Sequence, residues 1–410
     1  IDLADGVKMN SQYLGADWKH ETNNHWTIRN NVRYQVTDSK FNGALITAPT
    51  AYSSSKKYYY LDGQEIVSPT GYYTGQSVIT TINTDRQFID KLDISKKINN
   101  HFVSFGAGIH TYDVDAISLG AAFNSEIKNQ PRVILVGSPT LAAATGTSIS
   151  GYTDGSTVTN SVWASDEVIL GKWILDASVR FDQFINAGKR LINATPWTNT
   201  KDYEETQNLN TISLGFNHSI NEKNAIYGRY TKTYSAMTIG QYAAFTFNPA
   251  TVKDKTINMA EIGYKINMPK FSLFSSLVYA DLNNIASSML IPNTVGSFIS
   301  VPTFASSRNY SAEIEATYSP SSNLNFKLTA TLQNSKYTSY SVVAPSTARA
   351  DLANKPFVWD GNYAERIPSY MIDFAANYKF GKFDAFSNIR FIGKTWSAPS
   401  NVYQLGAYNE

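Results

Sequence analysis

The stretch Leu324-Asn325-Phe326-Lys327-Leu328-Thr329-Ala330-Thr331-Leu332-Gln333 alternates apolar and polar residues at every position. Successive side chains of a β-strand point to opposite faces, so this segment has one apolar face and one polar face. The segment before it, from Tyr310 to Tyr318, alternates in the same way, and Ser319 to Ser322 supply turn residues between the two. Together they predict an antiparallel hairpin of long strands and an all-β chain.

Alternation of this kind recurs along the chain and predicts about fourteen strands. Short turns rich in Asn, Gly, Pro and Ser alternate with connections of roughly 23 to 48 residues. Short turns on one side and long loops on the other are typical of outer-membrane β-barrels. The expected strands are residues 11–20, 25–36, 85–96, 101–112, 160–169, 172–182, 208–219, 224–232, 256–267, 270–281, 307–318, 323–334, 366–380 and 382–393.

Aromatic residues recur eight positions apart on the apolar face of five of these strands. Eight residues span roughly 26 Å along a strand, or about 20 Å of height once the strand is tilted by about 40°. That height is close to the apolar band between the two aromatic girdles of a membrane barrel, whereas strands of soluble β-sandwiches average about five or six residues. The five pairs are Trp26/Tyr34, Trp173/Phe181, Tyr310/Tyr318, Tyr370/Tyr378 and Phe383/Phe391.

The direction of the strands has a further implication. Strand 11–20 runs into a short turn and strand 382–393 leaves one, so Ile1 and Glu410 are both expected on the extracellular side. A closed single-chain barrel normally starts and finishes in the periplasm. We therefore expect residues 1–410 to be an interior segment of a larger barrel, with its closing strands elsewhere.

Composition agrees with a membrane barrel. Of 410 residues, 42% are hydrophobic and only 17% are charged, where about 25% is usual for soluble domains, and the net charge is +2. The chain has 26 Tyr, 21 Phe and 7 Trp but no basic block, which argues against nucleic-acid binding. It has no Cys, and its five His lack the spacing of a zinc motif, so we expect no metal site and no cofactor. No apolar run approaches the length of a transmembrane helix.

Several short blocks resemble the barrel domain of TonB-dependent outer-membrane receptors. Residues Ser165-Asp166-Glu167-Val168, then Gly171-Lys172-Trp173-Ile174-Leu175 and Ser178-Val179-Arg180-Phe181-Asp182, are similar to a strand pair of that family, with Ser178 in place of the usual Gly. Further blocks in the family's order are Asn224–Lys232, Glu261–Lys265, Ser311–Pro320 with Asn323-Leu324, Arg366-Ile367-Pro368 and Leu405–Tyr408. The resemblance covers most of Ser11 to Tyr408.

This resemblance implies a barrel of 22 strands, of which about eight lie outside the segment. It also implies a plug domain and a TonB box, neither of which is in this sequence, and thus partnership with the TonB complex and with outer-membrane lipid. The expected function is active uptake of a scarce bulky solute, such as an iron-siderophore, cobalamin or an oligosaccharide, in the bacterial outer membrane. The alternative is a passive porin or channel, which shares every barrel feature. No nucleophile motif accompanies His218, so no enzyme activity is expected.

Candidate ligand-binding residues are aromatic and basic side chains in the expected loops. Tyrosine rings stack on flat ligands or sugar faces at low entropic cost, and arginines pair with anions. Girdle or loop packing is the alternative role for the tyrosines. The candidates are Tyr58, Tyr59, Tyr60, Tyr72 and Tyr73 in loop 37–84, Tyr234 and Tyr242 in loop 233–255, lumen-facing Arg229 and the loop-edge residue Arg308.

Overall fold

The computed structural model describes residues 6–139, 148–191, 200–239, 253–293 and 298–410. Within these ranges, fourteen strands have ten residues or more, as the sequence predicts. The described residues contain no helix long and apolar enough to cross a membrane. The long strands are β1 (Val7–Glu21), β2 (Thr27–Ala51), β4 (Tyr72–Ile98), β5 (His101–Glu126), β7 (Ser148–Leu170), β8 (Trp173–Leu191), β9 (Thr200–Asn221), β10 (Asn224–Ser235), β11 (Lys255–Met268), β12 (Phe271–Pro292), β13 (Phe298–Ser321), β14 (Leu324–Val343), β16 (Tyr370–Phe380) and β17 (Phe383–Ile392).

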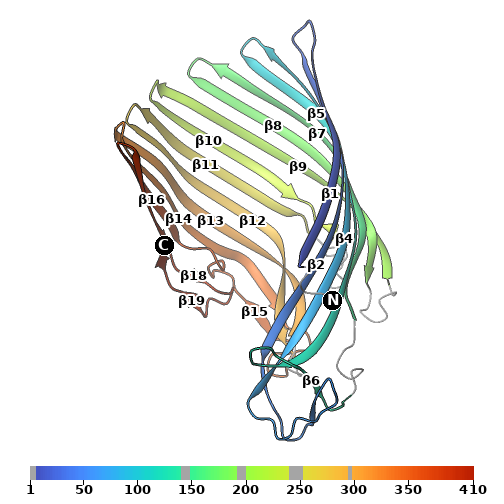
Figure 1. Cartoon of the computed structure of the whole chain (residues 1–410). Coiled ribbons are helices and arrows are strands. Elements are labelled where there is room, and N and C mark those ends of the chain that lie inside the picture. Colours follow the sequence, from blue (N-terminus) through green and yellow to red (C-terminus); the bar gives the residue numbers. More distant parts are fainter. Residues whose placement is uncertain (1–5, 140–147, 192–199, 240–252, 294–297) are drawn as a thin grey trace.

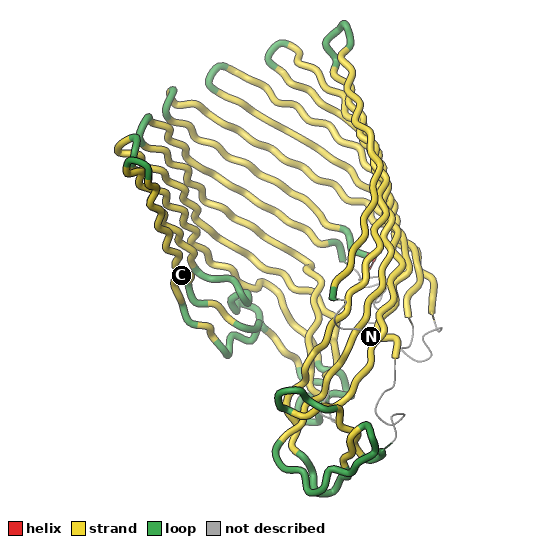
Figure 2. The backbone as a smooth tube through the Cα atoms, in the orientation of Figure 1, coloured by secondary structure: helices red, strands yellow, loops and turns green. Residues whose placement is uncertain are grey.

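Each long strand pairs antiparallel with the next long strand in the chain, which builds one continuous sheet from β1 to β17. The sheet is strongly curved, and its short turns lie along one edge (Figures 1 and 2). Strands β1 and β17, which are wholly described, do not pair with each other, so the sheet is open between them. The architecture is therefore an antiparallel meander of long strands.

Six short strands decorate the sheet at the ends far from the short turns. Strand β3 (Tyr58–Tyr60) pairs with β6 (Val133–Val136), and β15 (Pro356–Val358) continues the ladder along β14. Strand β18 (Thr395–Trp396) pairs with β19 (Gln404–Leu405), and β20 (Tyr408–Asn409) pairs with the end of β17. The long connections therefore carry structure of their own.

The strands extend much further than the sequence pattern predicts, and this corrects the expected loops. Strand β2 continues to Ala51 and β4 begins at Tyr72, so most of the expected loop 37–84 is a paired hairpin. Polar residues occupy both faces of the strand here, for example Thr37 and Ser39 on one face and Asn42 on the other, so the apolar alternation stops. Backbone hydrogen bonds need no such alternation, and the ladder continues beyond the apolar band.

The register assigns the two faces of the sheet. Leu328 has Ala316 and Phe374 as its Cα partners, whereas its neighbour Thr329 has Glu315 and Asp373. Ion pairs recur on the Thr329 side, which we call the polar wall. They are Asp17–Arg29, Lys91–Asp93, Arg180–Asp182, Asp176–Arg229, Glu315–Lys327 and Asp373–Arg390.

The opposite side, the aromatic face, presents the rings that recur at eight-residue spacing. Eight of the ten rings are exposed, so no protein layer covers them: Tyr34, Trp173, Phe181, Tyr310, Tyr318, Tyr378, Phe383 and Phe391. Exposed apolar surface on this scale marks contact with a partner or a membrane. The predicted facing of these strands is thus confirmed by the register.

Two of the short turns depend on glycine. Gly171, between β7 and β8, and Gly381, between β16 and β17, both have φ of +59°. Glycine adopts this left-handed conformation without a steric penalty, whereas most other residues are strained there. These turns allow each hairpin to reverse within two residues and keep the two faces in register.

Candidate functional site

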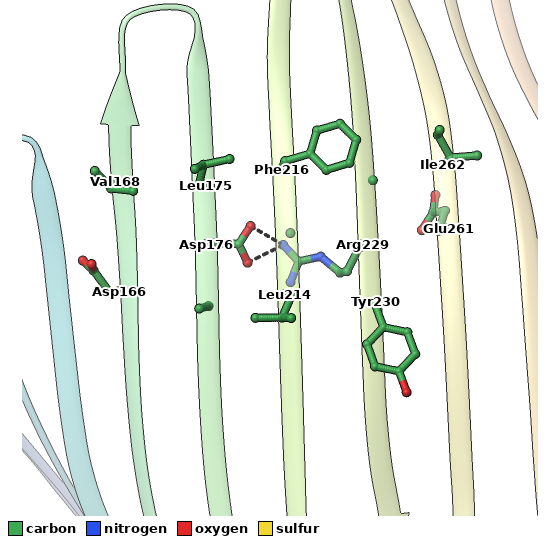
Figure 3. A pocket seen from close by; sticks show the side chains of 13 residues that line it. Asp166, Val168, Leu175, Asp176, Leu214, Phe216, Arg229, Tyr230, Glu261 and Ile262 are labelled. Carbon is green, nitrogen blue, oxygen red and sulfur yellow. Dashed lines mark hydrogen bonds and ion pairs between the residues drawn. The ribbon is translucent and has the colours of Figure 1, made fainter.

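The polar wall holds an ion pair that crosses a whole strand. Arg229 on β10 donates from Nη1 to Ser213 Oγ at 2.9 Å, and its Nη2 lies 2.9 Å from Asp176 Oδ1 on β8 (Figure 3). Gly215 on β9 lies between them in register, and a Cβ there would collide with the Asp176 carboxylate. Glycine at this position therefore leaves the room that the ion pair occupies.

A hollow of about 650 Å³ is associated with this part of the sheet. Its lining includes Asp176 and Arg229 from the polar wall, but also Leu175 and Leu214 from the aromatic face. Most of its lining residues, including Val168, Phe216 and Ile262, belong to the aromatic face, so the hollow is mainly a depression of that face.

A second cluster on the polar wall is centred on the Trp163 ring, on the strands next to β8. Trp163 on β7 packs its ring over Gly106 on β5 and donates from Nε1 to Asp93 Oδ1 at 3.1 Å. The Nζ atom of Lys91 lies 5.1 Å and the guanidinium carbon of Arg180 5.3 Å from the ring centroid. These cation–π contacts hold the ring against the wall in a charged environment.

A third cluster lies on β10 to β12. The Tyr227 hydroxyl donates to Glu261 Oε1 at 2.5 Å, and Lys265 Nζ lies 4.4 Å from the centre of its ring. The ring occupies the space that a Cβ at Gly263 would need. Polar and aromatic groups thus recur along the wall wherever a glycine on the next strand makes room.

The structure places five candidate tyrosines in a compact outer module built from β3, β6 and the far ends of β4 and β5. Tyr58 is 1% exposed and Tyr73 is 8% exposed, and their ring centroids lie 5.7 Å apart, beside Ile134. The Tyr58 hydroxyl accepts a hydrogen bond from the Ser53 amide at 2.9 Å. Tyr59 is half-buried, whereas Tyr72 is 60% exposed, so these two offer the module's more accessible rings.

Tyr60 belongs to an ionic cluster of the same module. Its hydroxyl donates to Glu126 Oε1 at 2.8 Å, and the guanidinium carbon of Arg132 lies 3.4 Å from its ring centroid. Burial opposes ionisation of Glu126, but hydrogen bonds from Lys128, Tyr60 and Arg132 outweigh it and lower the carboxyl pKa to about 2. The hydrogen bond to Glu126 in turn raises the pKa of Tyr60.

The other candidates lie apart from this module. Arg229 is on the polar wall, as the alternation predicts, while Arg308 is on the aromatic face, where its Nε donates to Asp281 Oδ1 at 3.1 Å. Tyr234 is the next-to-last residue of β10, and Lys232 Nζ lies 5.6 Å from its ring centroid. Tyr242 lies outside the described residues. The candidates therefore divide between an outer module, the wall and the aromatic face.

Sequence reasoning missed Trp163, Glu126, Arg132 and Asp176 as members of these clusters. Asp176 and Trp163 alternate onto the polar side of their strands, which was a usable signal. The link from Glu126 to Tyr60 joins residues far apart in the chain, and no local pattern carries it. Among the described residues, no group of three or more His, Cys, Asp or Glu side chains is arranged to hold a metal ion.

Comparison with known families identifies the sheet. Residues 2–409 match the family model described as TonB dependent receptor-like, beta-barrel. The chain belongs to this family. A search of curated protein sequences finds no match.

Solved structures of similar fold agree with membership of the TonB-dependent receptor barrels. The ferric-catecholate import receptor Fiu from E. coli K12, in its closed form, has a TM-score of 0.62 at 13% identity, covering 98% of this chain and 57% of that one. BauA, the ferric preacinetobactin receptor from Acinetobacter baumannii, has a TM-score of 0.61 at 12% identity, covering 98% and 55%. The siderophore receptor PiuA from the same organism has a TM-score of 0.59 at 13% identity, covering 100% and 71%.

At these identities the likeness establishes the fold alone. The TonB-dependent receptor barrel segment spans a little over half the length of the first two structures, 57% and 55%. Its long strands, alternating faces and short turns are the features that the family's barrel requires.

Proposed function

We propose that this chain forms barrel wall in an outer-membrane receptor that takes up a scarce, bulky solute with energy supplied through TonB. The observation that carries the proposal is the continuous sheet of fourteen long strands, with most of its ion pairs on one face and exposed aromatic rings on the other. Such a sheet suits lipid on its aromatic face and a polar interior on the wall side. Family membership adds the expectation of TonB coupling.

An iron-siderophore is the proposed ligand class. The similar structures with TM-scores near 0.6 are named as receptors for ferric catecholates, for ferric preacinetobactin and for a siderophore. Ferric siderophores are bulky, often flat in part and often anionic, and they suit exposed tyrosine rings and arginines. Cobalamin and oligosaccharides remain the alternatives that the uptake experiment distinguishes.

The proposed ligand contacts come from the outer module and the wall. Tyr72 and Tyr59 offer accessible rings, while buried Tyr58 and Tyr73 support the module that presents them. Arg229 is 44% exposed on the polar wall and is already paired with Asp176. We assign it to contact with a plug segment that fills the lumen or with the ligand on its way through.

The test is uptake of radiolabelled ferric siderophores by cells that carry or lack the full-length gene, each with and without TonB. We expect uptake that needs both the gene and TonB. Uptake of the solute that continues without TonB would favour the passive channel and contradict active transport. Parallel trials with labelled cobalamin and maltooligosaccharides identify the ligand class.

Matched variants test the outer module. Tyr72→Ala should weaken ligand binding at least several-fold while leaving the barrel folded, because its ring is exposed. Tyr58→Ala should instead loosen the module, because it removes a buried ring and the acceptor for Ser53. Unchanged ligand affinity in both variants would reject a role for this module in binding.

A further inference from the structure

The aromatic face changes character where the strands leave the apolar band, on the side away from the short turns. On β13 the outward residue after Tyr310 is Arg308, and on β12 the residue after Tyr279 is Asp281. On β14, Leu332 is followed on this face by Asn334 and then Lys336, and on β10, Tyr230 is followed by Lys232. We call Lys232, Arg308 and Lys336 the basic rim.

Arg308 and Lys336 are Cα partners across β13 and β14. Like charges directly opposite each other in a sheet are destabilising unless a counter-charge lies near them. Within the described residues, Asp281 is the acid in contact with the basic rim, through Arg308. Three cations and one acid leave a net charge of +2 at this place.

The rim's cations are positioned by aromatic rings. Lys336 Nζ lies 4.7 Å from the ring centroid of Tyr363, and the guanidinium carbon of Arg308 lies 5.7 Å from that of Tyr279. Lys232 Nζ makes the corresponding contact with Tyr234 at 5.6 Å. Tyrosine and basic side chains at this boundary are the combination found where a membrane's headgroups begin.

Two cations of the same face away from the short turns, one on β4 and one on β8, have acids beside them. Arg86 on β4 has Asp113 on β5 as its Cα partner, and Lys189 on β8 has its Nζ 3.8 Å from Asp154 on β7. Positive charge is therefore balanced there and in excess over β10 to β14. This asymmetry points to an anionic partner of the basic rim.

We propose that the basic rim binds the phosphate group of a membrane lipid headgroup, with the lipid's acyl chains lying along the apolar surface of β13 and β14. The assignment rests on the proposed placement of the aromatic face in the membrane. Below the rim, Tyr310, Ala312 and Leu332 offer continuous apolar surface for those chains. A phosphate between Arg308 and Lys336 would relieve the repulsion between the two cations.

The test uses full-length receptor purified in a detergent with an uncharged headgroup. Phosphatidic acid is titrated into the micelles and bound lipid is counted by native mass spectrometry, with phosphatidylcholine as the control lipid. Two basic side chains near an anionic headgroup raise the affinity for the lipid by about 30-fold. The double variant R308Q/K336Q should therefore bind phosphatidic acid about 30-fold more weakly than the wild type. The matched variant R86Q/K189Q should bind as the wild type does.

Asp281→Asn gives an independent test in the opposite direction. It removes the acid that competes for Arg308, so phosphatidic acid should bind several-fold more tightly. Equal affinity in the wild type, R308Q/K336Q and D281N would overturn the proposal, and so would displacement of the lipid by equimolar inorganic phosphate, which indicates a free-anion site. The lipid titration is made on purified receptor with no solute present, so its outcome is independent of the transport proposal.

Discussion

Placing one arginine on each face of β14 tests the assignment of the two faces to lipid and lumen. Leu328 lies two residues from Phe326, whose ring stacks with that of Phe374 at 6.0 Å, and it is part of the apolar surface that includes Ala316. It is therefore inside the proposed apolar band. An arginine on the lipid face costs about 2 to 4 kcal/mol at the midplane and less toward the interface. We expect Leu328→Arg to cost about 2 to 3 kcal/mol.

The matched variant is Thr329→Arg, one residue along the same strand. Thr329 has Glu315 and Asp373 as its Cα partners, and these acids are already paired with Lys327 and Arg390 at 2.9 and 2.8 Å. The new arginine would be a third cation beside these two acids on a water-exposed face, where ion pairs contribute little to the free energy of unfolding. We expect a cost below about 1 kcal/mol.

The assay is guanidinium-induced unfolding of the protein in lipid vesicles, with the free energy of unfolding taken by linear extrapolation. The slope of that free energy against denaturant should be the same in both variants, so that the difference reflects stability alone. Equal costs at Leu328 and Thr329, or a larger cost at Thr329, would refute the assignment of the faces.

Two further predictions concern the wall and the outer module. Gly106→Ala should lower the free energy of unfolding by about 1 to 3 kcal/mol, because its Cβ would collide with the Leu92 carbonyl oxygen and the Trp163 ring. At the control position Gly151 the nearest atom to an added Cβ is 3.5 Å away, so Gly151→Ala should be tolerated. Equal denaturation curves for the two variants would contradict this prediction. The pKa of Glu126 is lowered in the folded module, so its contribution to stability is full above pH about 4.5 and is lost as the pH falls toward about 2. The protection factors of the β3 amides, which are corrected for intrinsic exchange at each pH, should fall over that range, and Glu126→Gln should abolish this pH dependence. A dependence unchanged in this variant would show that another group is responsible.

Glycine has a distinct role in this sheet beyond its turns. Gly106, Gly215 and Gly263 each leave room for a side chain from a neighbouring strand, respectively the Trp163 ring, the Asp176–Arg229 pair and the Tyr227 ring. A wall built this way presents large polar and aromatic groups close against the backbone. It also gives strand registers a steric check, because a slip of one residue would put a Cβ into each of these positions.

The sequence by itself determined the strand class, the number of long strands and the faces of those strands. Alternation with period two is a local property, and ten residues such as Leu324 to Gln333 are enough to express it. It therefore correctly placed Arg229 on the polar side and the spaced aromatic rings on the other. The short turns could also be predicted, because residues such as Gly171 and Gly381 stand between two alternating segments. Both glycines adopt a positive φ in the structure.

The tertiary structure alone decided where the strands end and which side chains meet. Strands β2 and β4 continue far past the apolar alternation, because a polar hairpin is held by backbone hydrogen bonds that leave no hydrophobic pattern. Tyr58 looks like its neighbours in the sequence, yet it is buried because β3 pairs with a strand more than seventy residues away. The opposition of Arg308 and Lys336 likewise depends on the register between β13 and β14. Such contacts join residues distant in the chain, so only the folded sheet specifies them.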